Sequence, residues 1–218
     1  MQKSTVFKLI IGFLVIIAVI FSIYAHATAL FPGDLRVTTF LQSSSNPYLF
    51  IIMETLSSMF GGWYSILVIA IIGAIVWWRI GKLEAILIPV TGLLTFVNTA
   101  LKLVINHSRP EVIMVLNSPA SAAFGPVSEH PNNGFPSGHA FFAIILLGLL
   151  AYYIFITEKK PAVRVPALIG LIILILLVGI SRIYMGKHWL SDVLGGYLIG
   201  GIFLTVLIWF HQTRKSQR

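Results

Sequence analysis

Apolar residues lie along the chain in long runs that are separated by short polar segments. A helix needs about 20 mostly apolar residues to cross the hydrocarbon core of a membrane. Six runs approach or reach this length, and we predict a transmembrane span for each: Phe7–Ala25, Gly61–Trp78, Leu83–Ile105, Gly138–Thr157, Val165–Ser181 and His188–Phe210. The predicted fold is therefore an all-α bundle of six transmembrane helices.

Three local features modify this pattern. The stretch Pro47–Phe60 is apolar but contains Glu54, so we predict a short interfacial helix after the first span, with a partial span as the alternative. The tripeptide Ala25-His26-Ala27 resembles a signal-peptide cleavage site, but the preceding apolar run of about 17 residues is longer than such peptides use. We therefore favour a retained first helix. Pro89 predicts a kink in the third span.

Composition supports residence in a membrane. Hydrophobic residues make up 57% of the 218 residues and charged residues only 10%, against about 25% charged in an average soluble domain. We treat residues 1–218 as one membrane domain. The chain has no Cys, which excludes disulfides, thiolate metal sites and a cysteine nucleophile.

The net charge of +8 is first of all a signal of topology. With six crossings, ten of the 15 basic residues fall on one side: Lys3, Lys8, Arg79, Lys82, Lys159, Lys160, Arg164, Arg214, Lys215 and Arg218. The positive-inside rule makes this side cytoplasmic, together with both termini, in what we expect to be a bacterial cell membrane. We therefore reject nucleic-acid binding. The other five basic residues fall outside: Arg36, Lys102, Arg109, Arg182 and Lys187.

Four of these outer cations, Lys102, Arg109, Arg182 and Lys187, lie next to span ends that the topology brings to one side. Arginine and lysine without surplus carboxylates form an anion site, and the guanidinium fork suits phosphate oxygens. The Ser137-Gly138 turn adds a helix N-terminus, which also favours an anion. Taken singly, the lysine at 102 could snorkel to the interface and the serine at 137 could simply cap a helix.

His188 and Asp192 stand one helical turn apart, as a base and its orienting carboxylate would. If Asp192 accepts a proton from one ring nitrogen, the other nitrogen presents a lone pair for nucleophilic attack. His139, from another span, could act as general acid. A purely structural pair is the alternative. The set fits phosphoryl transfer, and no metal is expected because the sequence has no carboxylate cluster and no His-x-x-x-His.

The order of these residues resembles a known family. Three motifs occur in sequence: Lys102-(x)6-Arg109-Pro110, Pro136-Ser137-Gly138-His139, and Ser181-Arg182-(x)5-His188-(x)3-Asp192. With this motif-bearing core over residues 102–192, the chain resembles the type 2 phosphatidic acid phosphatase superfamily, which shares its site with vanadium haloperoxidases.

The resemblance implies a role for each matching residue. His188 would attack phosphorus and form a phosphohistidine, oriented by Asp192, and His139 would protonate the leaving oxygen. The phosphate would be held by Lys102, Arg109, Ser137, the Gly138 amide and Arg182. No metal and no cofactor are implied.

A lipid phosphatase acting at the outer face of the membrane is the leading hypothesis. Its substrate would be undecaprenyl diphosphate, which we favour slightly, phosphatidylglycerophosphate or phosphatidic acid. The alternatives are a vanadate-dependent peroxidase, disfavoured because those enzymes are soluble, and a protein that binds or transports a phosphate lipid without turnover. The sequence suggests no obligate protein partner.

His107, His130 and Lys187 are not signature residues of the three motifs. They are loop residues in one interpretation. In the other they hold a second phosphate or a charged headgroup.

Overall fold

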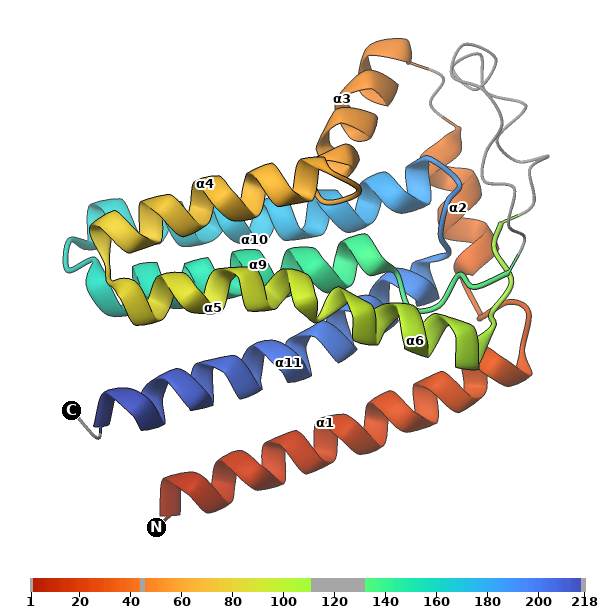
Figure 1. Ribbon diagram of the computed structural model, residues 1–218. Helices are drawn as coiled ribbons and strands as arrows, with labels where there is room; N and C mark the ends of the chain where they lie inside the picture. The colour runs from red at the N-terminus through yellow and green to blue at the C-terminus, as the bar shows by residue number, and fades with distance from the viewer. Residues whose placement is uncertain (1, 44–45, 111–131, 217–218) are drawn as a thin grey trace.

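The computed structural model describes residues 2–43, 46–110 and 132–216, and these form helices without a single strand among them. The helices are α1 (Gln2–Ala27), α2 (Asp34–Gln42), α3 (Pro47–Ser58), α4 (Tyr64–Arg79), α5 (Lys82–Leu93), α6 (Thr95–Ile105), α9 (Gly138–Thr157), α10 (Pro161–Tyr184) and α11 (Leu190–Ser216). The prediction of an all-α fold is confirmed. The longer helices run side by side as a bundle (Figure 1).

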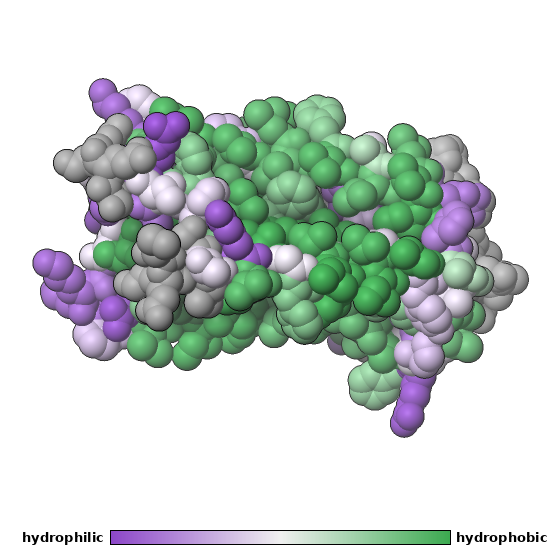
Figure 2. Space-filling view, turned by 90° about the horizontal axis from the view of Figure 1, so that it is seen from below, coloured by the Kyte–Doolittle hydropathy of each residue, from purple (hydrophilic) through white to green (hydrophobic). Residues whose placement is uncertain are grey.

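The bundle is that of a multi-pass membrane protein. Five segments are long and apolar enough to cross a membrane: α1, α5 together with α6, α9, α10 and α11. Helix α4 has 16 residues, which extend about 24 Å and fall short of the roughly 30 Å hydrocarbon core. The sixth crossing therefore stays a prediction. Figure 2 shows apolar side chains over the middle of the molecule and polar side chains at its two ends.

Helix α9 lies at the centre of the bundle. It packs against α5, α6, α10 and α11, and its buried side chains include Phe141, Ile145, Leu149 and Tyr153. A helix that is apolar on all sides is stable only when neighbours surround it, and α9 has this character. The first residues of α9 carry the Ser-Gly-His motif, so the core of the bundle fixes where that motif lies.

Two glycines of α11, Gly196 and Gly200, allow close contact with α9 and its N-cap. A Cβ atom on Gly196 or Gly200 would lie 2.6 or 2.8 Å from a backbone oxygen of α9 or its cap. A Cβ on Gly195 would overlap the Phe135 ring, whereas one on Gly201 would meet nothing within 4 Å. Gly196 and Gly200 are therefore the positions at which the two helices approach most closely.

The two ends of the bundle differ in what they carry. Both termini lie at one end, with the α4–α5 and α9–α10 connections (Figure 1). The opposite end collects α2, the end of α6, the start of α9 and the α10–α11 connection. The three motif segments therefore meet at the end away from the termini.

Local structure departs from the sequence prediction at two places. Helix α3 confirms the short helix after span one, and Asn46 caps it by accepting bonds from Tyr48 N and Leu49 N at 2.9 and 3.3 Å. Helix α2 was not predicted, because its nine residues of mixed polarity form no long apolar run. The third span is interrupted at Leu94, and Pro89 lies inside α5.

Candidate active site

The motif segments enclose a recess of about 480 Å³ at the α2 end of the bundle. Six of the eight site residues predicted from the sequence line it: Lys102, Arg109, Gly138, His139, Arg182 and His188. The other two, Ser137 and Asp192, are buried and join it through the backbone, because Ser137 N–H donates to the Asp192 carbonyl oxygen at 2.9 Å. The structure thus brings all eight together.

His188 precedes the first turn of α11 and is oriented by a carboxylate from that turn. Its Nδ1 lies 3.2 Å from Asp192 Oδ2, which also accepts the Trp189 backbone N–H at 3.0 Å. Because a carboxylate accepts, Nδ1 carries the proton and Nε2 keeps a lone pair. Burial lowers the pKa of His188 to about 3, although the bond to Asp192 acts in the opposite direction. The ring is therefore neutral and suited to nucleophilic attack.

The basic side chains are held by the segment that precedes α9. Lys102 Nζ donates to the carbonyl oxygens of Asn133 and Gly134 at 3.1 and 3.4 Å, and Arg109 Nη2 donates to Asn133 O at 3.3 Å. Lys102 therefore points into the recess and does not snorkel away from it. Burial lowers the pKa of Arg109, with the Asp192 charge opposing the shift.

Several polar atoms here have no protein partner. Arg109 Nε, Arg182 Nε and Ser137 Oγ are buried and make no hydrogen bond within the described residues. Ser137 occupies the N-cap position of α9, but its side chain makes no capping bond, so the simple capping interpretation is wrong. Buried polar atoms are normally paired. Unpaired donors beside the first amides of α9, including that of Gly138, suit the oxygens of a bound phosphate.

His139 lies against the backbone of Gly61, a residue that the sequence analysis did not single out. A Cβ atom on Gly61 would overlap Nε2 of the His139 ring. A second recess of about 220 Å³ adjoins the first, and His139 and Gly61 line both. Lys187 and Glu54 line the second recess. Lys187 is thus placed beside the main recess, where a headgroup could reach it.

His107 does not have the role that the headgroup hypothesis gave it. The side chain is buried and lines neither recess. Its Nδ1 lies 2.9 Å from Asp192 Oδ1, so it binds the orienting carboxylate and not a substrate. The headgroup hypothesis is therefore wrong for His107, and His130 lies outside the described residues.

A second unrecognised contact fixes the start of α11. Asp34, the first residue of α2, is buried and accepts from the N–H and the Oγ of Ser191, both at 2.8 Å, and from Phe31 N at 2.9 Å. No local pattern in the sequence links positions 34 and 191. The contact holds the residue next to Asp192.

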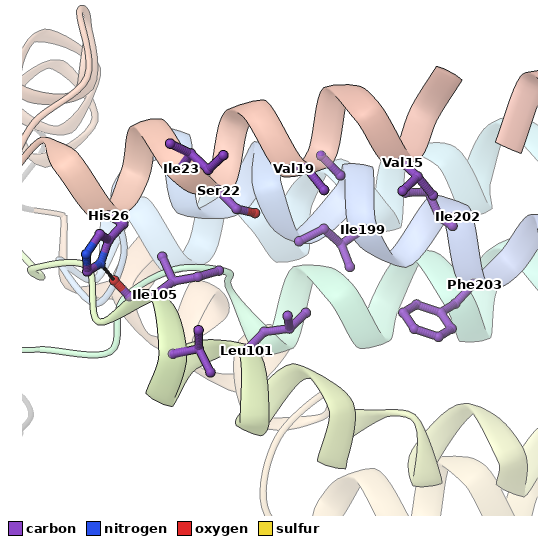
Figure 3. Close-up of a pocket in the computed structure, with 12 residues that line it drawn as sticks. Val15, Val19, Ser22, Ile23, His26, Leu101, Ile105, Ile199, Ile202 and Phe203 are labelled. Atoms are coloured by element: carbon purple, nitrogen blue, oxygen red, sulfur yellow. Dashed lines mark hydrogen bonds between the residues drawn. The ribbon is translucent and has the colours of Figure 1, made fainter. Parts of the chain in front are cut away.

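A larger groove lies elsewhere and has a different character. It measures about 560 Å³ between α1, α6 and α11, and its labelled lining residues are apolar apart from Ser22 and His26 (Figure 3). His26 Nδ1 is bonded to the Ile105 carbonyl oxygen at 2.9 Å. The groove therefore lacks the cations that line the recess beside His188. Within the described ranges, no three His, Cys, Asp or Glu side chains are arranged to hold a metal ion.

Comparison with known proteins agrees with this architecture. The profile of the PAP2 superfamily matches residues 83–216. Phosphatidylglycerophosphatase B of Bacillus subtilis strain 168 is 27% identical over 217 residues, 97% of each chain. The crystal structure of a transmembrane PAP2 type phosphatidylglycerolphosphate phosphatase from Bacillus subtilis gives a TM-score of 0.75 at 24% identity, covering 93% of this chain and 96% of the other. Aquifex aeolicus LpxE gives 0.58 at 21% identity, covering 82% and 96%. The matched region includes all three motif segments.

Proposed function

Because the chain belongs to the PAP2 superfamily, we propose that it is a membrane lipid phosphatase that works through a phosphohistidine at His188. The observation that carries this proposal is the orientation of the His188 ring. Its Nδ1 is engaged by Asp192, while the residue lines a recess that is also lined by two arginines and a lysine. A nucleophile facing an anion site is the arrangement that phosphoryl transfer requires.

The proposed reaction has two displacements. In the first, His188 Nε2 forms a bond to phosphorus and the bond from phosphorus to the lipid oxygen breaks, while His139 gives that oxygen a proton. In the second, water forms a bond to phosphorus and loses a proton to His139, and the phosphorus–nitrogen bond breaks. The products are a dephosphorylated lipid and inorganic phosphate.

The basic side chains would stabilise the charge that spreads over the phosphoryl oxygens. Lys102, Arg109 and Arg182 supply cations from three different segments, and Ser137 and the Gly138 amide add neutral donors. The unpaired buried atoms of Arg109, Arg182 and Ser137 support this assignment. We propose that no metal takes part, since the three cations supply the positive charge that a metal would otherwise provide.

We propose phosphatidylglycerophosphate as the preferred substrate, ahead of undecaprenyl diphosphate and phosphatidic acid. The full-length relative with that named activity supports this order. So does Glu54, whose carboxylate shares the smaller recess with Lys187. A carboxylate beside the site would repel a second phosphate group directly attached to the first. In phosphatidylglycerophosphate a glycerol separates the two phosphate groups, and its free hydroxyl can donate a hydrogen bond to the carboxylate.

The topology proposal places the recess at the outer face and both termini in the cytoplasm. Every basic residue assigned to the cytoplasm that lies in the described ranges falls on helix ends or connections at the terminal end of the bundle. The positive-inside rule then orients the bundle.

The test is phosphate release by the purified protein in detergent with a chelator present. Phosphatidylglycerophosphate, undecaprenyl diphosphate and phosphatidic acid are compared at equal surface concentration, with His188→Ala as control. Release that needs His188 and is blocked by vanadate supports the mechanism, and the ranking of kcat/KM tests the substrate. Binding of these lipids without any release would instead favour a binding or transport protein, and loss of release on chelation would contradict metal independence.

A further inference from the structure

Asp192 is bonded by two histidine rings at once. Its Oδ2 faces His188 at 3.2 Å, and its Oδ1 faces His107 Nδ1 at 2.9 Å. The carboxylate has no exposed surface, and the His107 side chain has none either. Since a carboxylate only accepts, both Nδ1 atoms donate to it. Each oxygen of the Asp192 carboxylate therefore accepts a hydrogen bond from a different histidine.

The ring of His107 is itself fixed by its surroundings. It follows α6 directly after Asn106, and the edges of Phe31 and Phe135 pack on it with ring centroids 6.0 and 6.3 Å away. The His107 carbonyl oxygen accepts the Gly134 N–H at 2.8 Å. Ring and backbone are thus held in place by the segment before α2 and the segment before α9.

We propose that His107 is a positioning residue that acts through Asp192 to orient the His188 nucleophile. A carboxylate bound at one oxygen alone can rotate about its χ2 angle, which is a soft torsion. The bond from His107 to Oδ1 prevents this rotation and keeps Oδ2 directed at His188 Nδ1. The role rests on the proposed function, because it concerns the nucleophile of that reaction.

The same bond couples the two parts of the site. His107 lies two residues before Arg109, one of the three cations that we propose bind the phosphate. Asp192 belongs to the helix that orients the nucleophile. The contact therefore sets the distance between the anion-binding segment and the attacking nitrogen, which is the geometry on which an in-line displacement depends.

Loss of the His107 side chain should change kcat and KM to different extents. His107 does not line the recess, so its loss should leave KM within about two-fold, while a misoriented nucleophile lowers kcat by about 10- to 100-fold. Three variants separate hydrogen bonding from shape. His107→Leu fills similar volume without a donor. His107→Asn places a side-chain N–H near the position of Nδ1, and His107→Gln carries its donor one methylene further out.

The experiment measures kcat, KM and thermal unfolding for these variants, and the rise in unfolding temperature that vanadate, a mimic of the transferring phosphoryl group, produces. We expect the Leu and Gln variants to lose kcat and most of the vanadate effect, and the Asn variant to recover both to within about five-fold. The role is overturned if the three variants have the same kcat. It is also overturned if all three lose kcat and unfolding temperature to the same extent.

Failure of this inference can be told from failure of the proposed function. If the wild-type protein releases no phosphate from any lipid, the phosphatase proposal fails. The vanadate comparison still decides the role of His107, because it reports on His188 without turnover. If His107→Leu does not fold, the comparison of Asn with Gln gives the answer.

Discussion

Gly196→Ala offers a sharp test of how tightly the catalytic segments are packed. The added Cβ would lie 2.6 Å from the carbonyl oxygen of Ser137, 3.1 Å from Ala140 Cβ and 3.2 Å from Phe141 N. Normal contact begins at 3.4 Å, so the two helices must separate by about 0.8 Å, the difference between 3.4 and 2.6 Å. Two of these three atoms belong to the backbone, so no rotamer change can relieve the clash.

The strain falls on the turn at Ser137, which we propose binds phosphate. Ser137 N–H is bonded to the Asp192 carbonyl oxygen at 2.9 Å, and separation of the helices stretches this bond between the two halves of the site. Overpacking costs about 1–3 kcal/mol, against which Ala gains about 1 kcal/mol of helix propensity over Gly. We therefore expect a net loss of roughly 0–2 kcal/mol in unfolding free energy. Misplacement on the order of 1 Å should lower kcat/KM by about 100-fold.

Gly201→Ala is the matched control for Gly196→Ala. It lies on the same helix, and its added Cβ would meet nothing within 4 Å. It should keep full activity and gain up to about 1 kcal/mol in stability. The assays are phosphate release and unfolding in detergent. Full activity of Gly196→Ala, or an equal loss in both variants, would refute the reasoning.

Three further predictions concern groups at the start of α11, the nucleophile and the far end of the bundle. Asp34→Ala removes the acceptor of both Ser191 bonds and should lower stability by about 1–3 kcal/mol and also kcat, whereas Asp34→Asn should lose less of both in the same assays. The pKa of His188 is about 3, below its ordinary 6.5, so its contribution to stability is present above pH 6.5 and is lost as pH falls toward 3. In denaturant unfolding across this window, the unfolding free energy should fall less steeply with falling pH in His188→Gln than in the wild type. An equal dependence on pH in the two proteins would contradict the assignment. His211 bonds Glu84 and Tyr152, both at 2.9 Å, so His211→Leu should lower the unfolding temperature but leave kcat unchanged. A fall in kcat would show that the far end is coupled to the site.

The parts of the fold set by local periodicity could be predicted from the sequence. The span predicted at Gly138–Thr157 coincides with α9, because an unbroken apolar run leaves little choice of boundary. The meeting of the three motif segments could also be predicted. Each motif lies at the end of a span, and the number of crossings decides which span ends share one side of the membrane. The length of α4 and the interruption at Leu94 depend on packing, which leaves no periodic trace.

The contacts that orient the site were beyond sequence reasoning. His107 and Asp192 are 85 positions apart, and Asp34 and Ser191 are 157 apart, so no spacing rule connects them. One chemical signal was available for the first pair. A buried carboxylate has two oxygens, and the motif supplies a partner for only one, which leaves a second donor to be found.

The first turn of α11 is the junction on which the site depends. Asp34 holds Ser191, His107 holds the Asp192 side chain, and Ser137 holds the Asp192 backbone oxygen. These three contacts come from the start of α2, the segment after α6 and the segment before α9, yet all converge on two adjacent residues. Substitutions at these contacts should therefore change kcat through His188, whereas substitutions of the recess cations remove groups that we propose bind the phosphate and should also raise KM. Measuring both constants for Asp34→Ala and Lys102→Ala would separate the two classes, and a rise in KM for Asp34→Ala alone would contradict this division.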